Sequence, residues 1–237
     1  MPSPNDKEAP RWGFVEVVIG IFAAAFVSQA LPSTYITLTG STPTAFSTRL
    51  LGILGVWMAF LGVPWLASRY RGSGRLALDF GLRFQLPRDA LYGLALGVFA
   101  QLVLVQLIYL PLRILNPELY DKVDDVAKEV TNFGPDWQLA VIAIGVVAIA
   151  PLVEEVFFRG LTQRAFARRF GPRVTVVSSG VVFALVHWQG LQFPALLGFG
   201  LFLAVIAQRT GRLGINIFAH AGFNGVTVIQ LLFLRYM

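Results

Sequence analysis

The sequence predicts an all-α fold, a polytopic transmembrane helical bundle of about seven spans. Of its 237 residues, 56% are hydrophobic and only 14% are charged, whereas soluble domains carry about a quarter charged residues. The mean hydropathy is +0.67. The hydrophobic residues gather in long runs, with no internal repeat and no linker-bounded soluble segment between them. We therefore expect one membrane domain over residues 1–237, with three spans and an acidic loop in 1–137 and a helical core in 138–237.

The apolar runs give the expected spans in chain order. A helix needs about 20 apolar residues to cross a bilayer. The fifth and sixth runs have 15 residues each, so we expect tilted spans, a thin membrane or a re-entrant hairpin there. The first run could also be a signal peptide, but Glu16 inside it argues against cleavage. The seven runs are Gly13–Leu31, Leu50–Ala67, Ala90–Leu112, Leu139–Phe166, Val174–Trp188, Phe193–Ala207 and Leu213–Leu234.

Basic residues predict a cytoplasmic N-terminus, because cytoplasmic loops retain Lys and Arg. The loop Asn116–Trp137 on the opposite side carries six acidic residues against two lysines. The net charge of +6 does not indicate nucleic-acid binding, because the same charges follow from the topology. Cytoplasmic segments hold 13 of the 19 basic residues: Lys7, Arg11, Arg69, Arg71, Arg75, Arg83, Arg88, Arg164, Arg168, Arg169, Arg173, Arg209 and Arg212.

Three charged residues near the end of the fourth run indicate a functional site. Each charge near the bilayer centre costs about 2.5–3.5 kcal/mol on insertion scales, so Glu154, Glu155 and Arg159 need pairing or a wet cavity. Glu155 and Arg159 are four residues apart with the acid first, which favours an intrahelical pair. Glu154 points about 100° away and stays unpaired locally, which suits a general base. Pro151 cannot donate a helix hydrogen bond, which predicts a kinked, hydrated pocket.

The chain has two histidines, and both fall in apolar runs. His220 and Asn224 share one helical face, as do Phe183 and His187. Glu154 lies level with His187, about 20 Å from the cytoplasmic end, only if the fourth helix continues to about Arg168. A shared site therefore requires a long fourth helix. The absence of cysteine excludes a thiolate nucleophile.

These residues form three ordered motifs, EExxxR, FxxxH and HxxxN, within 139–229. Together they resemble the motifs of the CPBP family of intramembrane proteases, also called Abi or CAAX proteases, which includes the Ras-converting CAAX endopeptidase type. The first three spans match this family only in being hydrophobic. The motif residues are Glu154, Glu155, Arg159, Phe183, His187, His220 and Asn224.

The resemblance implies an endopeptidase that cleaves a membrane-associated substrate, such as a lipidated or CAAX-type protein, with a glutamate-activated water and no cofactor. It implies that Glu154 is the general base and that His187 helps to hold the water. It also implies that His220 and Asn224 stabilise the oxyanion. Glu155 and Arg159 would orient the site or bind substrate backbone, and the residues expected to bind substrate are Phe183 and Arg159.

Three alternatives remain open. Two histidines and a glutamate can hold catalytic zinc, although HExxH is absent and Asn224 is a poor zinc ligand. A non-catalytic membrane binding or immunity protein could use the same cluster, and a transporter is disfavoured by the lack of repeats. The expected partners are the lipid bilayer and a membrane-associated peptide or protein. We expect the cell membrane as location, with the active site towards the cytoplasmic leaflet, where Arg164, Arg168 and Arg169 follow the motif.

Overall fold

The structure is a computed structural model that describes residues 11–120, 122 and 135–236, with side chains to 233. The described residues form helices and no strand. Six of these helical segments are long and apolar enough to cross a membrane, which confirms the predicted polytopic bundle. Much of the predicted acidic loop lies outside the described residues.

The helices are labelled in chain order, and η marks π-helical segments. The two short π segments η3 and η4 interrupt the fourth span. The elements are α1 (Phe14–Thr39), α2 (Phe46–Arg71), α3 (Leu76–Asp79), α4 (Arg88–Phe99), η1 (Ala100–Leu104), α5 (Val105–Leu115), α7 (Asp136–Ile144), η3 (Gly145–Ile149), α8 (Ala150–Glu155), η4 (Val156–Thr162), α9 (Gln163–Ala167), α10 (Pro172–Val186), α11 (Phe193–Thr210) and α12 (Gly214–Tyr236).

Two predicted spans need correction. The sixth run, expected to be short, is an 18-residue helix, α11, that counts among the six long spans. Its polar residues Gln208 and Arg209 do not end it, because the helix continues to Gly211, whose positive φ of 65° closes it. The fifth run is short as expected, but α10 ends at Val186 and excludes Trp188, which has a positive φ of 54°.

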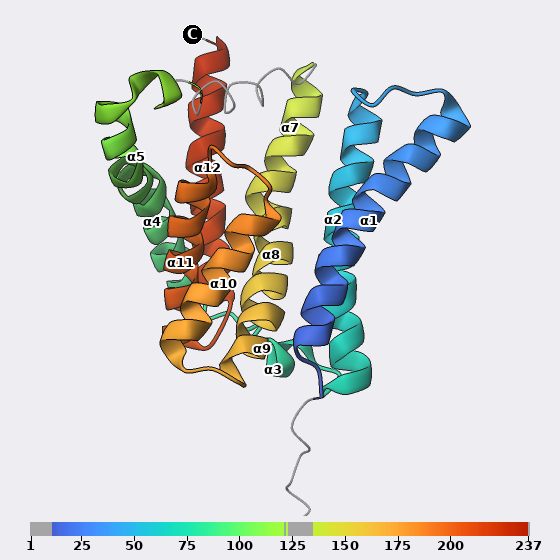
Figure 1. The fold of residues 1–237 in the computed structure, drawn as a ribbon, viewed down its shortest axis with the longest axis vertical. Helices are drawn as coiled ribbons and strands as arrows, with labels where there is room; N and C mark the ends of the chain where they lie inside the picture. The colour runs from blue at the N-terminus through green and yellow to red at the C-terminus, as the bar shows by residue number, and fades with distance from the viewer. Residues whose placement is uncertain (1–10, 121, 123–134, 237) are drawn as a thin grey trace, which may run out of the picture.

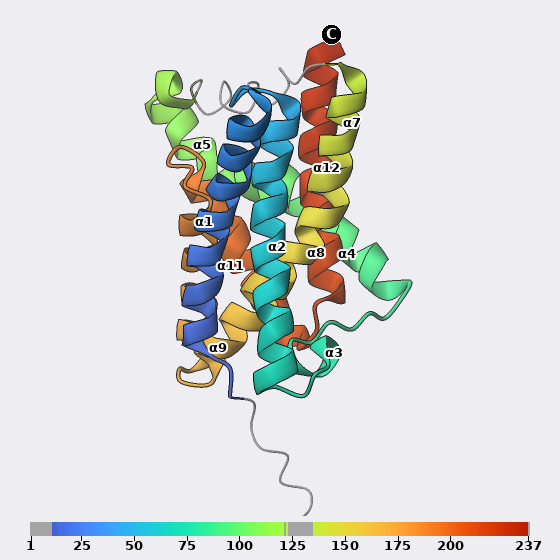
Figure 2. The ribbon, with the colours of Figure 1, turned by 90° about the vertical axis from the view of Figure 1, so that its right-hand side faces the viewer.

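The helices lie side by side in a bundle (Figure 1). α1 and α2 pair at one side, the fourth span (α7 to α9) runs down the middle, and α4, α5, α11 and α12 lie at the other side. Figure 2 gives the view with α1 and α2 in front of the others. α1 begins at the lower end and α12 ends at the upper end, as an odd number of crossings requires.

Glycines let α4 and α12 approach closely. Gly93 and Gly97 are four residues apart on α4, and a Cβ at Gly97 would lie 2.6 Å from the backbone nitrogen of Phe223. Gly222 faces them from α12, where a Cβ would lie 2.8 Å from the carbonyl oxygen of Leu94. Small residues at such spacing are typical of membrane helix interfaces. This contact fixes the helix that carries His220 and Asn224.

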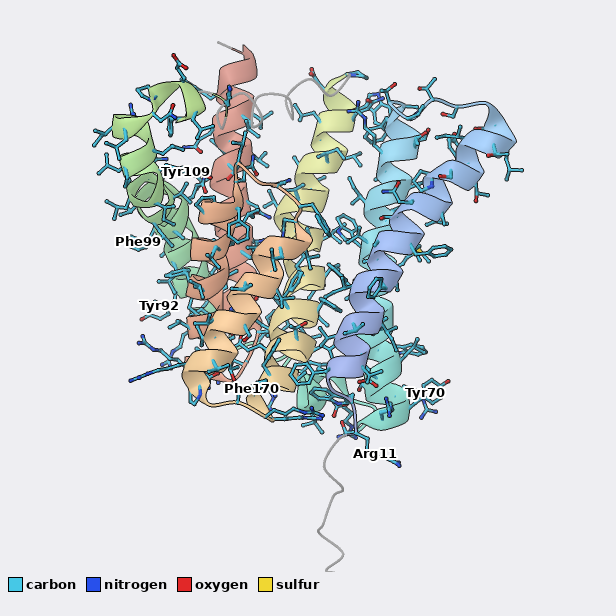
Figure 3. The ribbon with its side chains drawn as sticks, viewed as in Figure 1. Arg11, Tyr70, Tyr92, Phe99, Tyr109 and Phe170 are labelled. Atoms are coloured by element: carbon cyan, nitrogen blue, oxygen red, sulfur yellow. The ribbon has the colours of Figure 1, made fainter. Side chains whose placement is uncertain are left out.

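The lower end of the bundle combines basic loops with exposed aromatic rings. Figure 3 shows Arg11, Tyr70 and Phe170 at this end, and the Tyr70 ring is 71% exposed. On the outer side of α4, Tyr92 and Phe99 point away from the bundle, as lipid-facing side chains do. Aromatic rings are enriched at membrane interfaces, so the lower end has the features of an interface.

Candidate active site

The fourth span is one continuous helical run from Asp136 to Ala167, 32 residues long. This confirms the long fourth helix that a shared site requires. The run is not uniform, because η3 precedes the short helix α8 and η4 follows it. Glu154 and Glu155 end α8, and Arg159 lies in η4. π-helical turns are frequent at functional sites, but the hydrophobic pattern gave no signal for them.

Pro151 leaves one backbone carbonyl group without its helical donor, and the side chain of Asn224 bonds to that carbonyl. In η3 the N–H of Ala150 bonds the carbonyl of Gly145, five residues earlier. The next such bond would join Pro151 to Val146, and proline has no N–H to donate. The side chain of Asn224 takes its place, since Nδ2 donates to the Val146 carbonyl oxygen at 2.8 Å. The carbonyl that Pro151 was expected to free therefore anchors α12 to the fourth span.

Glu155 is held between two partners in the interior. Its Oε1 accepts hydrogen bonds from Arg159 Nη1 at 3.0 Å and from His220 Nδ1 at 3.0 Å. The side chains of Glu155 and Arg159 are both 0% exposed. Arg159 Nη2 also donates to the carbonyl oxygen of Gly200 on α11 at 3.0 Å. The predicted Glu155–Arg159 pair is present, and it orients the His220 ring.

Glu154 faces the two histidines instead. Its Oε2 lies 3.7 Å from Nε2 of His187 and 3.8 Å from Nε2 of His220. These distances exceed hydrogen-bond range, so the three groups converge on one point without bonding one another directly. The side chains of Glu154 and His187 are 18% and 23% exposed, against 5% for His220. The structure thus brings together the three titratable side chains that sequence spacing alone had placed on separate helices.

His187 lies at the end of α10 rather than inside it. Its Nδ1 is 2.7 Å from the carbonyl oxygen of Phe183, and α10 ends one residue earlier at Val186. Because a carbonyl oxygen only accepts, the neutral ring carries its proton on Nδ1. Nε2, which faces Glu154, then offers a lone pair.

Aromatic rings surround the site. Phe183 is 1% exposed, with the His187 ring 4.5 Å away and the Arg159 guanidinium 4.5 Å above its own ring. This burial suits a positioning role for Phe183 better than the substrate contact predicted for it. Sequence spacing missed Phe199, whose ring lies 5.3 Å from that of His220 and stacks on Phe223. One more phenylalanine in a chain with 20 carries no signal of its own.

Among the described residues, no group of three or more His, Cys, Asp or Glu side chains has an arrangement that could hold a metal ion. The zinc alternative and the expectation of a cofactor-free site both stay predictions, and metal analysis is the measurement that decides between them.

A carboxylate facing two imidazoles, beside a buried ion pair in a helical membrane bundle, defines a candidate hydrolytic site inside an integral membrane protein. Residues 136–226 match the family model described as type II CAAX prenyl endopeptidase Rce1-like. This segment contains every motif residue, and the match supports the CPBP, or CAAX protease, family predicted from them. The family is one of membrane proteases. No match was found among curated proteins or among solved structures.

Proposed function

We propose that this protein is an intramembrane endopeptidase that hydrolyses a peptide bond of a membrane-associated substrate with a water activated by Glu154. The observation that carries the proposal is the convergence of Glu154 Oε2 on Nε2 of His187 and of His220, at 3.7 and 3.8 Å. A lipidated or CAAX-type substrate is the class that the family description suggests.

The tautomer of His187 fits it for holding the water together with Glu154. With the Nδ1 proton on the Phe183 carbonyl, Nε2 accepts one proton of the water and Glu154 Oε2 accepts the other. Both hydrogens are then directed into the protein, and an oxygen lone pair is free for the substrate carbonyl. Glu154 takes the proton as the bond to carbon forms, and returns it to the leaving amine.

His220 is the first candidate donor for the oxyanion. Its Nδ1 donates to Oε1 of Glu155 at 3.0 Å, which orients the ring, and its Nε2 lies on the side of Glu154. With Nδ1 bonded to Glu155, Nε2 carries a proton only in the imidazolium form. In that form His220 would donate from Nε2 to the developing oxyanion.

Asn224 supplies the second donor. It follows His220 by one helical turn, and one of its two amide protons is used on the Val146 carbonyl. The remaining amide proton is available for the oxyanion. One such donor contributes about 2.7–4 kcal/mol of transition-state stabilisation in other proteases.

Substrate access to the site is part of the proposal. Phe158 and Arg159 follow Glu154 towards the basic lower end, and they are 0% and 1% exposed. These two side chains are packed inside the protein next to Glu154. We propose that substrate enters between helices from the cytoplasmic leaflet, which suits a chain already anchored in the bilayer.

The test is cleavage of lipidated CAAX-type peptides and of transmembrane peptides by purified protein, read by mass spectrometry. Glu154→Gln keeps the shape of the side chain but cannot accept the water proton, so we expect a loss of at least about 100-fold in kcat. Glu118→Gln, an exposed change of the same kind, is the control and keeps full activity. Cleavage by the Glu154 variant at the wild-type rate would contradict the proposal.

A further inference from the structure

A polar cavity lies at the lower end of the bundle, where α9 and the turn between α11 and α12 meet. Its volume is about 240 Å³. Pockets for whole small-molecule ligands usually measure about 300–1,000 Å³, so this one suits a single small group. We call it the basic pocket, and its polar lining consists of Arg159, Gln163, Arg164, Gln208 and Arg212.

The basic pocket carries excess positive charge. Two of its three guanidinium groups have carboxylate partners, since Arg159 pairs with Glu155 and Arg212 Nη2 lies 2.6 Å from Asp89 Oδ1. Arg164 instead donates to the carbonyl oxygen of Gly211 at 2.8 Å, and no described carboxylate lies within ion-pair distance of it. An anion in the cavity would supply the missing charge.

Two of the arginines also have unused donors. The Nε atoms of Arg159 and of Arg212 are buried and have no hydrogen-bond partner among the described residues. Such unpaired buried donors are costly, and more so when they are charged. Phosphate oxygens match guanidinium donors well and accept several hydrogen bonds at once. The two unused arginine donors would therefore suit an anion in the cavity, beside one unused acceptor of the lining, Gln163 Oε1.

The position of the pocket points to the source of the anion. The lower end carries the basic loops and the exposed rings of Tyr70 and Phe170. These are features of a membrane interface, and lipid phosphates lie at the depth of that interface. Basic pockets between transmembrane helices on this side are able to bind anionic headgroups.

We propose that the basic pocket binds a phosphate group, either of a lipid headgroup or of a soluble phosphate. Arg164 would form the main charge contact with the phosphate. This proposal does not depend on the proposed proteolytic function. Arg159 is shared with the candidate active site, so the tests use Arg164 and Gln208. Neither residue contacts Glu154, Glu155 or the histidines in any interaction that the structure gives.

The first arm titrates purified protein with inorganic phosphate and records thermal unfolding and binding heat. Gln208→Glu places a negative charge at the pocket while still accepting the bond from Gln163 Nε2, now 3.5 Å long. We expect this variant and Arg164→Gln to weaken phosphate binding at least tenfold. Arg173→Gln removes an exposed charge at the same end, outside the pocket, and we expect wild-type binding.

The second arm reconstitutes the same variants in phosphatidylcholine nanodiscs doped with phosphatidylglycerol and counts retained lipids by native mass spectrometry. Selective retention of phosphatidylglycerol that both pocket variants lose assigns the pocket to a headgroup. Phosphate binding with the same variant pattern, without lipid selectivity, assigns it to a soluble phosphate. Equal binding by the pocket variants and Arg173→Gln would overturn the proposal. So would a response to acetate in the absence of any response to phosphate or phosphatidylglycerol, since that would indicate a carboxylate site.

Discussion

Glu155 is the side chain that holds both of its neighbouring nitrogen donors in position. Arg159 and His220 donate to the same oxygen of Glu155, at 3.0 Å each, and Arg159 is 1% exposed. Glu154, one residue away, is part-exposed, and its Oε2 has no hydrogen-bond partner among the residues that the structure describes. The two adjacent glutamates therefore have different physical tasks, Glu155 in structure and ring orientation and Glu154 in the proposed chemistry.

We expect Glu155→Gln to lower the free energy of unfolding by about 3–5 kcal/mol, because it leaves a buried guanidinium without its counter-charge. Activity should fall as well, since His220 loses the acceptor that orients it. Glu154→Gln should unfold at nearly the wild-type temperature. Thermal unfolding in detergent, run beside the cleavage assay, checks both. Equal melting temperatures with activity kept in the Glu154 variant would mean that the roles are reversed.

Metal dependence is decided at the same residues. If Glu154 and His187 activate water directly, zinc should be substoichiometric by elemental analysis and chelators should leave turnover unchanged. A zinc mechanism predicts activity lost on chelation and restored by metal, because the ion lowers the pKa of bound water to about 7. Asn224→Asp separates the two further, since a carboxylate beside an oxyanion slows a metal-free enzyme but improves a zinc ligand set.

The control for this variant is Asn216→Asp, also on α12. Asn216 Nδ2 donates to the Leu203 carbonyl oxygen at 2.7 Å, much as Asn224 donates to Val146, but it lies about 12 Å along the helix. Both changes remove one side-chain hydrogen bond, which is buried at Asn216 and part-buried at Asn224. Only Asn224→Asp should reduce kcat beyond the loss of stability that the two share. One equivalent of tightly bound zinc with chelator-sensitive turnover would rule out the water-only mechanism.

At the scale of elements, the fourth span determines whether the site exists. Its 32 residues bring Glu154 level with His187 at the end of α10 and continue beyond Arg159. The π segments η3 and η4 lie on both sides of α8, whose two adjacent glutamates face different neighbours because they are about 100° apart around the helix axis. The Pro151 gap in the hydrogen-bond ladder then lets α12 attach through Asn224.

We expect Pro151→Ala to impair activity without lowering stability. Alanine supplies an N–H for the Val146 carbonyl, which competes with Asn224 and releases its amide from the position proposed for oxyanion binding. The expected loss in kcat is about tenfold to a hundredfold, with an unchanged or higher melting temperature. Pro172→Ala at the first residue of α10 is the control, since proline there replaces no hydrogen bond. Full activity in the Pro151 variant would show that the gap is not needed.

For the whole molecule, the open question is which way the bundle faces. The basic segments that follow α2, α9 and α11 all lie at the lower end (Figure 1), and positive residues stay in the cytoplasm. The upper end carries the α1–α2 turn and the start of α7. The positive-inside rule therefore predicts that α1 begins in the cytoplasm.

Single-cysteine labelling tests this orientation cleanly, because the chain has no native cysteine. Thr44→Cys lies in the exposed α1–α2 turn and Arg173→Cys at the start of α10, at opposite ends. We expect a membrane-impermeant maleimide applied to intact cells to label the Thr44 variant and not the Arg173 variant. Permeabilised cells, in which both should react, control for accessibility. The reverse pattern would invert the topology and the leaflet from which substrate enters.

The sequence by itself determined the class of fold, the approximate spans and the residues of the candidate site. Hydrophobic runs and basic loops are properties of composition, and helical spacing of three or four residues is local. These patterns can therefore be recognised in the sequence without a structure. The pairing of Glu155 with Arg159 followed for the same reason. The family membership came from ordered motifs that keep these spacings.

The contacts between side chains on different helices could be known only from the tertiary structure. The convergence of Glu154 on His187 and His220, the hold of Asn224 on Val146, and the burial of Phe183 all join residues that lie on different helices. The sequence also did not predict the π turns, because a single extra residue in a helical turn leaves the apolar pattern almost unchanged. Hydrophobicity selects membrane helices without specifying their partners, and it is close packing and hydrogen bonding between them that fix which faces meet.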